Sequence, residues 1–130
     1  MQLITDEWAQ AYTFAWNNDE TIAKKLKNFS TVFKYAISDR EDLAPIVIKV
    51  EKGVCTTFGT EENFTAKEIE FDMWADTKSW RRVFDRDISV KKAMISKGFG
   101  FKGPKLKAIA NMGGFERSIE LMIEMDDITV

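Results

Sequence analysis

Residues Asp72 to Phe115 read DMWADTKSWRRVFDRDISVKKAMISKGFGFKGPKLKAIANMGGF, and this stretch determines the architecture expected for the rest of the chain. Every methionine except the first lies at or after Met73, and aromatic residues are interleaved with them: Trp74, Trp80, Phe84, Phe99, Phe101 and Phe115. Methionine and aromatic side chains form adaptable apolar surface that fills irregular cores or holds flexible apolar ligands. The stretch therefore predicts either a tightly packed core or an apolar binding site.

Positive charge is concentrated in the same stretch. From Lys78 to Lys107 there are ten Lys or Arg residues and two Asp, a local balance of +8, and the remainder of the chain has nine basic and nineteen acidic residues. This asymmetry is typical of a surface that meets an anionic partner, although a solvated helix face explains it equally well.

The length and composition indicate one ordinary globular domain. The chain has 130 residues, of which 45% are hydrophobic and 31% charged, and we expect residues 1–130 to form a single core. It has one cysteine, Cys55, and no histidine, which excludes an internal disulfide and removes the commonest ligand of zinc and haem. We therefore expect no metal and no cofactor, and a reducing compartment.

Nothing in the first residues predicts a secretory leader. Residues 1–16 contain two acidic residues and no basic one, and no apolar run is long enough to cross a bilayer. On these grounds we expect a cytoplasmic protein.

The residues before the quoted stretch predict two helices and then strands. Thr5 is expected to cap a helix with an aromatic stripe at Trp8, Tyr12 and Trp16, and a second helix is expected to place Ile22, Leu26 and Phe29 on one side. From Thr31 the period changes to two, which predicts a strand over 31–38, a hairpin over 46–58 with its turn at Lys52-Gly53, and a strand over 68–73.

Within the stretch, capping residues and glycines predict alternating short elements. Asp76 or Thr77 is expected to start one helix and Ser89 another, Phe99 to Lys102 a fifth strand, and Pro104 a third short helix. Gly113-Gly114 is expected to precede a last helix from Phe115, apolar over more than half of its circumference. The predicted fold class is α+β, with a five-stranded, mainly antiparallel sheet covered by helices.

Two motifs suggest nucleotide or nucleic-acid binding. Gly98 to Gly103 matches the G-x-G-x-x-G pattern, but a dinucleotide site needs a strand before the glycines and a helix after them, and here the order is reversed. Lys97 to Phe101 matches the start of an RNA-recognition signature, whose aromatic residues stack on bases. Lys102 and Pro104 depart from that signature, so single-stranded nucleic acid binding is a minor alternative.

Catalytic candidates are few. Cys55 lies in an alternating strand with no histidine to activate it. The other candidates are the carboxylates Asp72, Asp76, Asp85 and Asp87; Asp85 and Asp87 flank Arg86 between two helices, where capping or ion pairing explains them, and an enzyme that uses carboxylates alone is a minor alternative. We therefore expect a protein that is not an enzyme.

The order of elements from about Thr31 to Met122 resembles the sterol carrier protein type 2 family of lipid-binding domains. The resemblance rests on three segments in sequence: the strand at 69–73 that continues into a capped helix with Trp80, the helix at 90–94, and the glycine-bounded strand at 98–103 before the closing helix. The connection from Gly103 to Gly114 is longer than the family pattern. The resemblance implies an α+β domain that encloses an apolar tunnel for acyl chains, sterols or similar lipids.

By position, the resemblance places ten residues at or near the tunnel: Trp80, Phe84, Met94, Phe99, Phe101, Ile109, Met112, Phe115, Ile119 and Met122. From the basic stretch we predict head-group or membrane contacts by Arg81, Arg82, Lys102 and Lys105, which would attract an anionic head group or an anionic membrane surface. The expected function is binding or transfer of a fatty acid, acyl-CoA, sterol or similar lipid. The alternative is an interaction or dimerisation module in which all these side chains are core, and the oligomeric state stays open.

Overall fold

The computed structural model describes residues 1–130 and contains helices and strands in the expected order. The helices are α1 (Asp6–Asn17), α2 (Glu20–Lys25), η1 (Glu61–Asn63), α3 (Thr77–Phe84), α4 (Val90–Met94), α5 (Lys105–Ala110) and α6 (Met112–Glu124). The strands are β1 (Thr31–Ile37), β2 (Ile46–Glu51), β3 (Val54–Gly59), β4 (Phe71–Ala75) and β5 (Phe99–Lys102). The predicted α+β class with five strands is confirmed.

The strands form one mixed sheet in the order β3-β2-β1-β4-β5. β1 pairs with β4 in parallel, with Phe33 beside Phe71, and the other three pairings are antiparallel. The parallel pair arises because the β2–β3 hairpin and the segment 60–70 bring the chain back to the free side of β1. The last two strands, β4 and β5, form one half of the sheet. The short helices of residues 72–115 lie next to this half.

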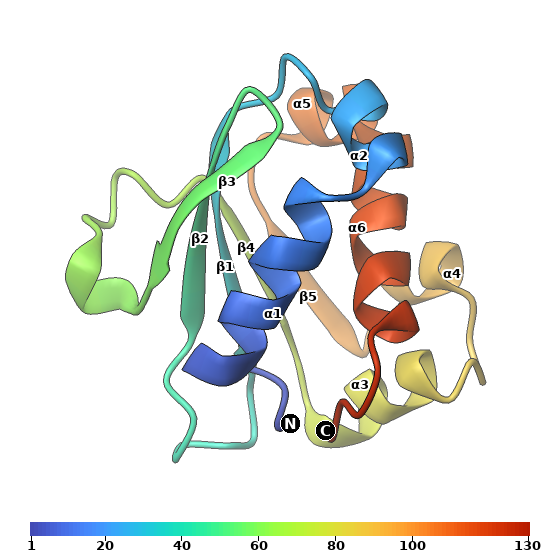
Figure 1. Ribbon diagram of the computed structural model, residues 1–130. Helices are drawn as coiled ribbons and strands as arrows, with labels where there is room; N and C mark the ends of the chain where they lie inside the picture. Colours follow the sequence, from blue (N-terminus) through green and yellow to red (C-terminus); the bar gives the residue numbers. More distant parts are fainter.

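The main helices cover one face of this sheet (Figure 1). α1 crosses β2 and β3, and α6 lies beside α1 and contacts α2, α4 and α5. The opposite face is partly covered by the segment 61–70, which lies over the outward side chains Lys34 and Asp72. Both termini lie at one end of the molecule, and α2 and α5 lie at the other (Figure 1). No helix has the length and apolar character that crossing a membrane requires.

Helix caps and one turn explain why the elements begin where they do. The Thr5 hydroxyl accepts a hydrogen bond from the Trp8 amide (3.2 Å), and the Asp76 carboxylate accepts one from the Ser79 amide (2.8 Å). The β2–β3 turn places Lys52 and Gly53 at φ values of 48° and 81°, the left-handed conformation that a two-residue hairpin turn requires. The caps and the turn are local signals, and they can be recognised in the sequence.

Aromatic rings form the centre of the core. Phe33 of β1 stacks on Phe71 of β4 with ring centroids 5.2 Å apart, and Phe115 of α6 meets both rings edge-on at 5.3 Å. The connected core contains 29 buried residues and extends from α1 to α6 across the sheet. Much of the methionine and aromatic surface noted in the sequence is therefore core.

Several boundaries differ from the predictions. β4 spans Phe71–Ala75 rather than 68–73, β1 ends at Ile37 rather than Ser38, and Phe29 follows α2 instead of belonging to it. α6 begins at Met112, so Gly113 and Gly114 lie inside the helix rather than before it. The physical reason is close packing: a Cβ atom on Gly114 would collide with the Leu26 side chain of the α2 C-cap, so glycine is needed there inside the helix.

Candidate functional site

Four elements from the quoted stretch enclose an apolar pocket. α4, β5, α5 and the start of α6 border a space of about 200 Å³. It is lined by Lys91, Met94, Ile95, Phe101, Ala108, Met112 and Glu116. Because the lining side chains are mostly aliphatic, sulfur-containing or aromatic, this space favours an apolar occupant.

Local sequence signals position the lining residues. The Ser89 hydroxyl accepts a hydrogen bond from the Lys92 amide (3.2 Å) and starts α4, which places Met94 in the pocket wall. Phe101 projects from β5 toward the helices and contacts Phe71, with 5.5 Å between ring centroids. Pro104 starts α5, in which Ala108 is the one buried residue. Met112 opens α6 and completes the wall.

The rim of the pocket is polar and partly open. Lys91 and Glu116 each contribute to the lining, and both side chains reach it from helices, α4 and α6 respectively. Ile95 lies at the mouth and is 84% exposed. A ligand with an apolar body and a charged end can thus place its body against the methionines and its end beside Lys91 or water.

The expected tunnel residues separate into three groups. Met94, Phe101 and Met112 line the pocket. Phe115, Ile119 and Met122 are buried in the core next to α1 and the sheet, and Trp80 and Phe84 of α3 pack with Phe99 of β5 at another part of the same core. Ile109 is 67% exposed on α5 and lies outside the pocket. The continuous apolar tunnel implied by the family resemblance is not seen.

Trp80 shows why an aromatic residue in this stretch can be structural. Its side chain is fully buried, its indole N–H donates a hydrogen bond to the Ala36 carbonyl oxygen (3.1 Å), and Phe99 packs edge-on at 4.9 Å. These contacts fix α3 against the sheet. They leave no free surface of the indole for a ligand.

Sequence reasoning missed four lining residues. Ile95, Ala108, Lys91 and Glu116 were not among the expected site residues. Ala108 is small, so its importance arises from the close approach of α5 to β5 and α6, which no sequence pattern displays. Ile95 follows Met94 directly at the end of α4, and its apolar character was the one available signal.

The four expected basic contacts do not come together. The Arg81 guanidinium donates to the backbone oxygen of Val130 (2.9 Å), whereas Lys102 lies opposite Asp72 in the β4–β5 register. Arg82 is exposed on α3 and Lys105 is exposed at the start of α5, and α3 and α5 lie at opposite ends of the molecule (Figure 1). The basic stretch is therefore spread over several surfaces.

The aromatic pair of β5 faces inward. Phe99 packs on Trp80 and Phe101 on Phe71, so both half-buried rings lie against the core. On the other face of β5, Gly100 is covered by the indole of Trp74, its partner across the strands. Rings that pack on the core offer little flat surface on which a base could stack, which argues against the RNA-recognition interpretation.

Groups capable of chemistry are few. Cys55 is buried, and burial raises the pKa of its thiol to about 12, so the thiol stays protonated at neutral pH. Its backbone N–H and C=O are both bonded to the Asn17 side chain (2.8 and 3.0 Å), which ties β3 to the end of α1. No group of three or more His, Cys, Asp or Glu side chains is placed to hold a metal ion.

A larger groove lies on the opposite face of the sheet, but its character is different. It measures about 430 Å³ and is lined mostly by charged side chains, including Lys34, Glu61 and Asp72. Lys34 is within 3.1 Å of Glu61 and 3.8 Å of Asp72. Burial raises the pKa of Asp72, and Lys34 opposes that shift. Lys34 neutralises part of the negative charge, and because most of the lining is charged, with Ala66 and Ile69 as its apolar members, this groove favours a polar occupant over a lipid chain.

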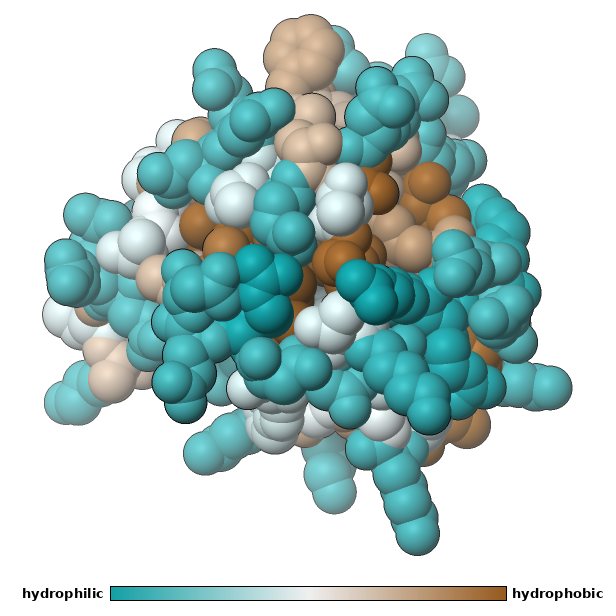
Figure 2. Space-filling view, turned by 90° about the horizontal axis from the view of Figure 1, so that it is seen from below, coloured by the Kyte–Doolittle hydropathy of each residue, from teal (hydrophilic) through white to brown (hydrophobic).

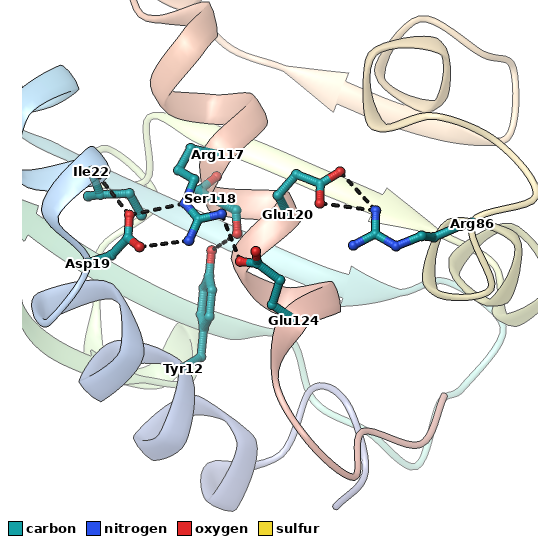
Figure 3. A network of polar contacts seen from close by, with 8 residues as sticks. All are labelled: Tyr12, Asp19, Ile22, Arg86, Arg117, Ser118, Glu120 and Glu124. Atoms are coloured by element: carbon teal, nitrogen blue, oxygen red, sulfur yellow. Dashed lines mark hydrogen bonds and ion pairs between the residues drawn. The ribbon is translucent and has the colours of Figure 1, made fainter.

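Ion pairs hold α6, one wall of the pocket, in place (Figure 3). Arg117 donates to the Asp19 carboxylate through two nitrogens (2.7 and 3.1 Å) and contacts Glu124 at 2.7 Å. Arg86 reaches Glu120 from the α3–α4 connection at 3.1 Å. In Figure 3, Asp19 meets Arg117 on one flank of α6, and Arg86 meets Glu120 on the other flank. α6 is thereby tied to the start of α2 and to the α3–α4 connection.

Solved structures identify the fold. A crystal structure of sterol carrier protein 2 superposes with a TM-score of 0.79 at 19% sequence identity, covering 95% of this chain and 98% of that chain. The chain has the fold of sterol carrier protein 2. A conserved hypothetical protein from Thermus thermophilus has a TM-score of 0.74 at 20% identity over 95% of this chain and 90% of that chain.

Other structures with the sterol carrier protein 2 fold are more distant. Sterol carrier protein 2 from Yarrowia lipolytica, in its apo form, has a TM-score of 0.50 at 12% identity and covers 93% of this chain and 97% of that chain. No sequence-family model matches the chain, and no curated protein sequence matches it significantly. At these identities the likeness establishes the architecture, which confirms the resemblance inferred from the order of elements.

Proposed function

We propose that this protein binds a hydrophobic ligand with an aliphatic chain, such as a fatty acid, an acyl-CoA or a related lipid, and carries it without changing it chemically. The observation that supports this most directly is the apolar pocket between α4, β5, α5 and α6. Two similar structures are named sterol carrier protein 2, which supports a lipid as the class of ligand.

The size of the pocket favours a flexible chain over a rigid ring system. Its volume is about 200 Å³, smaller than the roughly 300–1,000 Å³ of typical small-molecule sites. A segment of about six methylene groups would gain roughly 5 kcal/mol on burial, at about 0.8 kcal/mol for each group. A sterol nucleus would require α4 or α5 to move outward. Lys91 at the rim would pair with a carboxylate or phosphate at the end of the chain.

Two substitutions in the same helix test the pocket. Ala108→Phe places a ring in the wall of the pocket, and Ala110→Phe makes the same chemical change on the exposed side of α5. Delipidated wild-type protein and the Ala110→Phe variant are expected to bind a fluorescent fatty acid at micromolar concentration. Ala108→Phe is expected to weaken binding by about tenfold or more, equivalent to at least about 1.4 kcal/mol.

Circular dichroism and thermal unfolding of both variants verify that the domain stays folded. Equal binding by the wild type and both variants would show that the ligand lies elsewhere. A complete absence of binding by folded wild-type protein would remove the proposed function altogether. Tight binding of a single-stranded oligonucleotide that Phe101→Ala abolishes without unfolding would favour the base-stacking alternative.

A further inference from the structure

α5 exposes an apolar face with no partner in the structure. Leu106 is 85% exposed and Ile109 is 67% exposed. They are three positions apart in the helix, so they lie on the same side. The aromatic stripe of α1, by contrast, is completely buried in the core. α5 is therefore the helix on which two large apolar side chains, Leu106 and Ile109, are exposed on the same side.

A strongly basic surface lies at the same end of the molecule, on another side of α5 (Figure 1). Lys24, Lys25 and Lys27 from α2 and its end border a groove of about 480 Å³ together with Lys107 of α5, and no acidic side chain lines it. None of the first three lysines forms an ion pair. Lys107 is paired with Glu70 at 2.6 Å, which neutralises the acidic group nearest to the groove.

Lysines and apolar residues thus occupy the same end of the molecule. α2 and α5 lie side by side at the end opposite to both termini (Figure 1). The end that carries the termini is mainly hydrophilic, and hydrophobic atoms appear there only as limited patches between polar ones (Figure 2). An anionic bilayer complements the first end in both respects, because it offers negative head groups above an apolar interior.

We propose that the end formed by α2 and α5 docks on anionic phospholipid bilayers. Leu106 and Ile109 enter the boundary between head groups and acyl chains, and Lys24, Lys25 and Lys105 lie among the phosphates. This inference goes beyond the proposed function and does not require an occupied pocket. It would bring the pocket close to the bilayer, because Ala108 of the same helix lines it.

Vesicle co-sedimentation tests the proposal with two pairs of variants. Wild-type protein is expected to bind vesicles of phosphatidylcholine with phosphatidylserine and to bind phosphatidylcholine alone much more weakly. Leu106→Gln/Ile109→Gln is expected to lower the affinity by about tenfold. Its control, Phe14→Gln, removes an apolar side chain that is 72% exposed on α1 and should leave the affinity unchanged.

The second pair of variants tests whether binding depends on this surface or on the total charge of the protein. Lys24→Gln/Lys25→Gln is expected to weaken binding by about fivefold for each lysine, and added salt should reduce the difference. Lys78→Gln/Arg82→Gln removes the same charge from exposed positions of α3, at the other end, and should have little effect.

Several results would overturn the proposal. Equal binding to neutral and anionic vesicles would do so, as would a larger loss from the α3 variant than from the α2 variant. Binding to an oligonucleotide with none to vesicles would show that the basic groove serves another polyanion. Fatty-acid binding without vesicles is measured in parallel, because the exposed variants should retain it. Its loss in the wild type would remove the proposed function and leave the docking result standing.

Discussion

Asp19 shows how one side chain can have two structural roles. Its carboxylate accepts a hydrogen bond from the Ile22 amide (3.0 Å), which caps α2, and it also accepts two hydrogen bonds from Arg117 of α6. The hydrogen bonds from Arg117, followed by the bond from Ile22, lower the pKa of Asp19 in the folded protein. Since the unfolded chain has the ordinary pKa, ionised Asp19 stabilises the fold above about pH 4, and this contribution is lost as the pH falls through the lowered value.

Substitution of Asp19 separates the cap from the charge. Asparagine caps helices as well as aspartate does, so Asp19→Asn should lose only the ion pair, about 1 kcal/mol, whereas Asp19→Ala should lose about 2 kcal/mol. The stability of Asp19→Asn should also fall less steeply than that of the wild type between neutral and acidic pH. Urea unfolding at several pH values measures both effects. Parallel pH profiles for the wild type and Asp19→Asn would contradict the assigned role of the charge.

At the scale of elements, the contact between α2 and α6 depends on one glycine. Gly114 lies where a Cβ atom would collide with the buried side chain of Leu26. Gly113, its neighbour in the same helix, faces the flexible end of Lys25, 3.0 Å from where its Cβ would be. The same substitution should therefore destabilise the protein at Gly114 but not at Gly113.

Gly114→Ala is expected to destabilise the protein by about 1–3 kcal/mol, because the two helices must separate or Leu26 must leave its place. Gly113→Ala should leave the stability unchanged or raise it by up to about 1 kcal/mol, since alanine favours a helix and Lys25 can move. Thermal unfolding of the two variants gives the comparison, with each serving as the control for the other. A similar melting temperature for both would show that the α2–α6 contact is not as close as the structure has it.

Contacts between distant residues also explain which features of the elements could not be predicted from the sequence. Capping residues such as Asp76 and Ser89, and the Lys52-Gly53 turn, act over a few positions, and the elements that they start were predicted correctly. The glycines at 113 and 114 were interpreted as a break, because only the tertiary contact with Leu26 shows why a helix contains them. The parallel pairing of β1 with β4 is likewise a long-range property.

For the whole molecule, apolar surface in the quoted stretch could be predicted, but the position of the pocket only in part. Methionine and aromatic residues in the stretch indicated apolar surface, and Met94, Phe101 and Met112 do line the pocket. Periodicity could not distinguish them from Phe115 or Met122, which fill the core, since both sets lie on apolar faces. The basic residues were grouped by their nearness in sequence, whereas folding sends α3 and α5 to opposite ends and brings the α2 lysines beside α5.

Native mass spectrometry of the purified protein, before and after addition of a long-chain fatty acid, tests the central claim most directly. If the apolar pocket is a lipid site, the spectrum should show a chain that takes up one fatty acid, and Ala108→Phe should abolish that mass increase while Ala110→Phe retains it. A folded protein that stays free of lipid at every concentration, in particular as an empty dimer, would contradict the claim and favour the interaction module with a filled core.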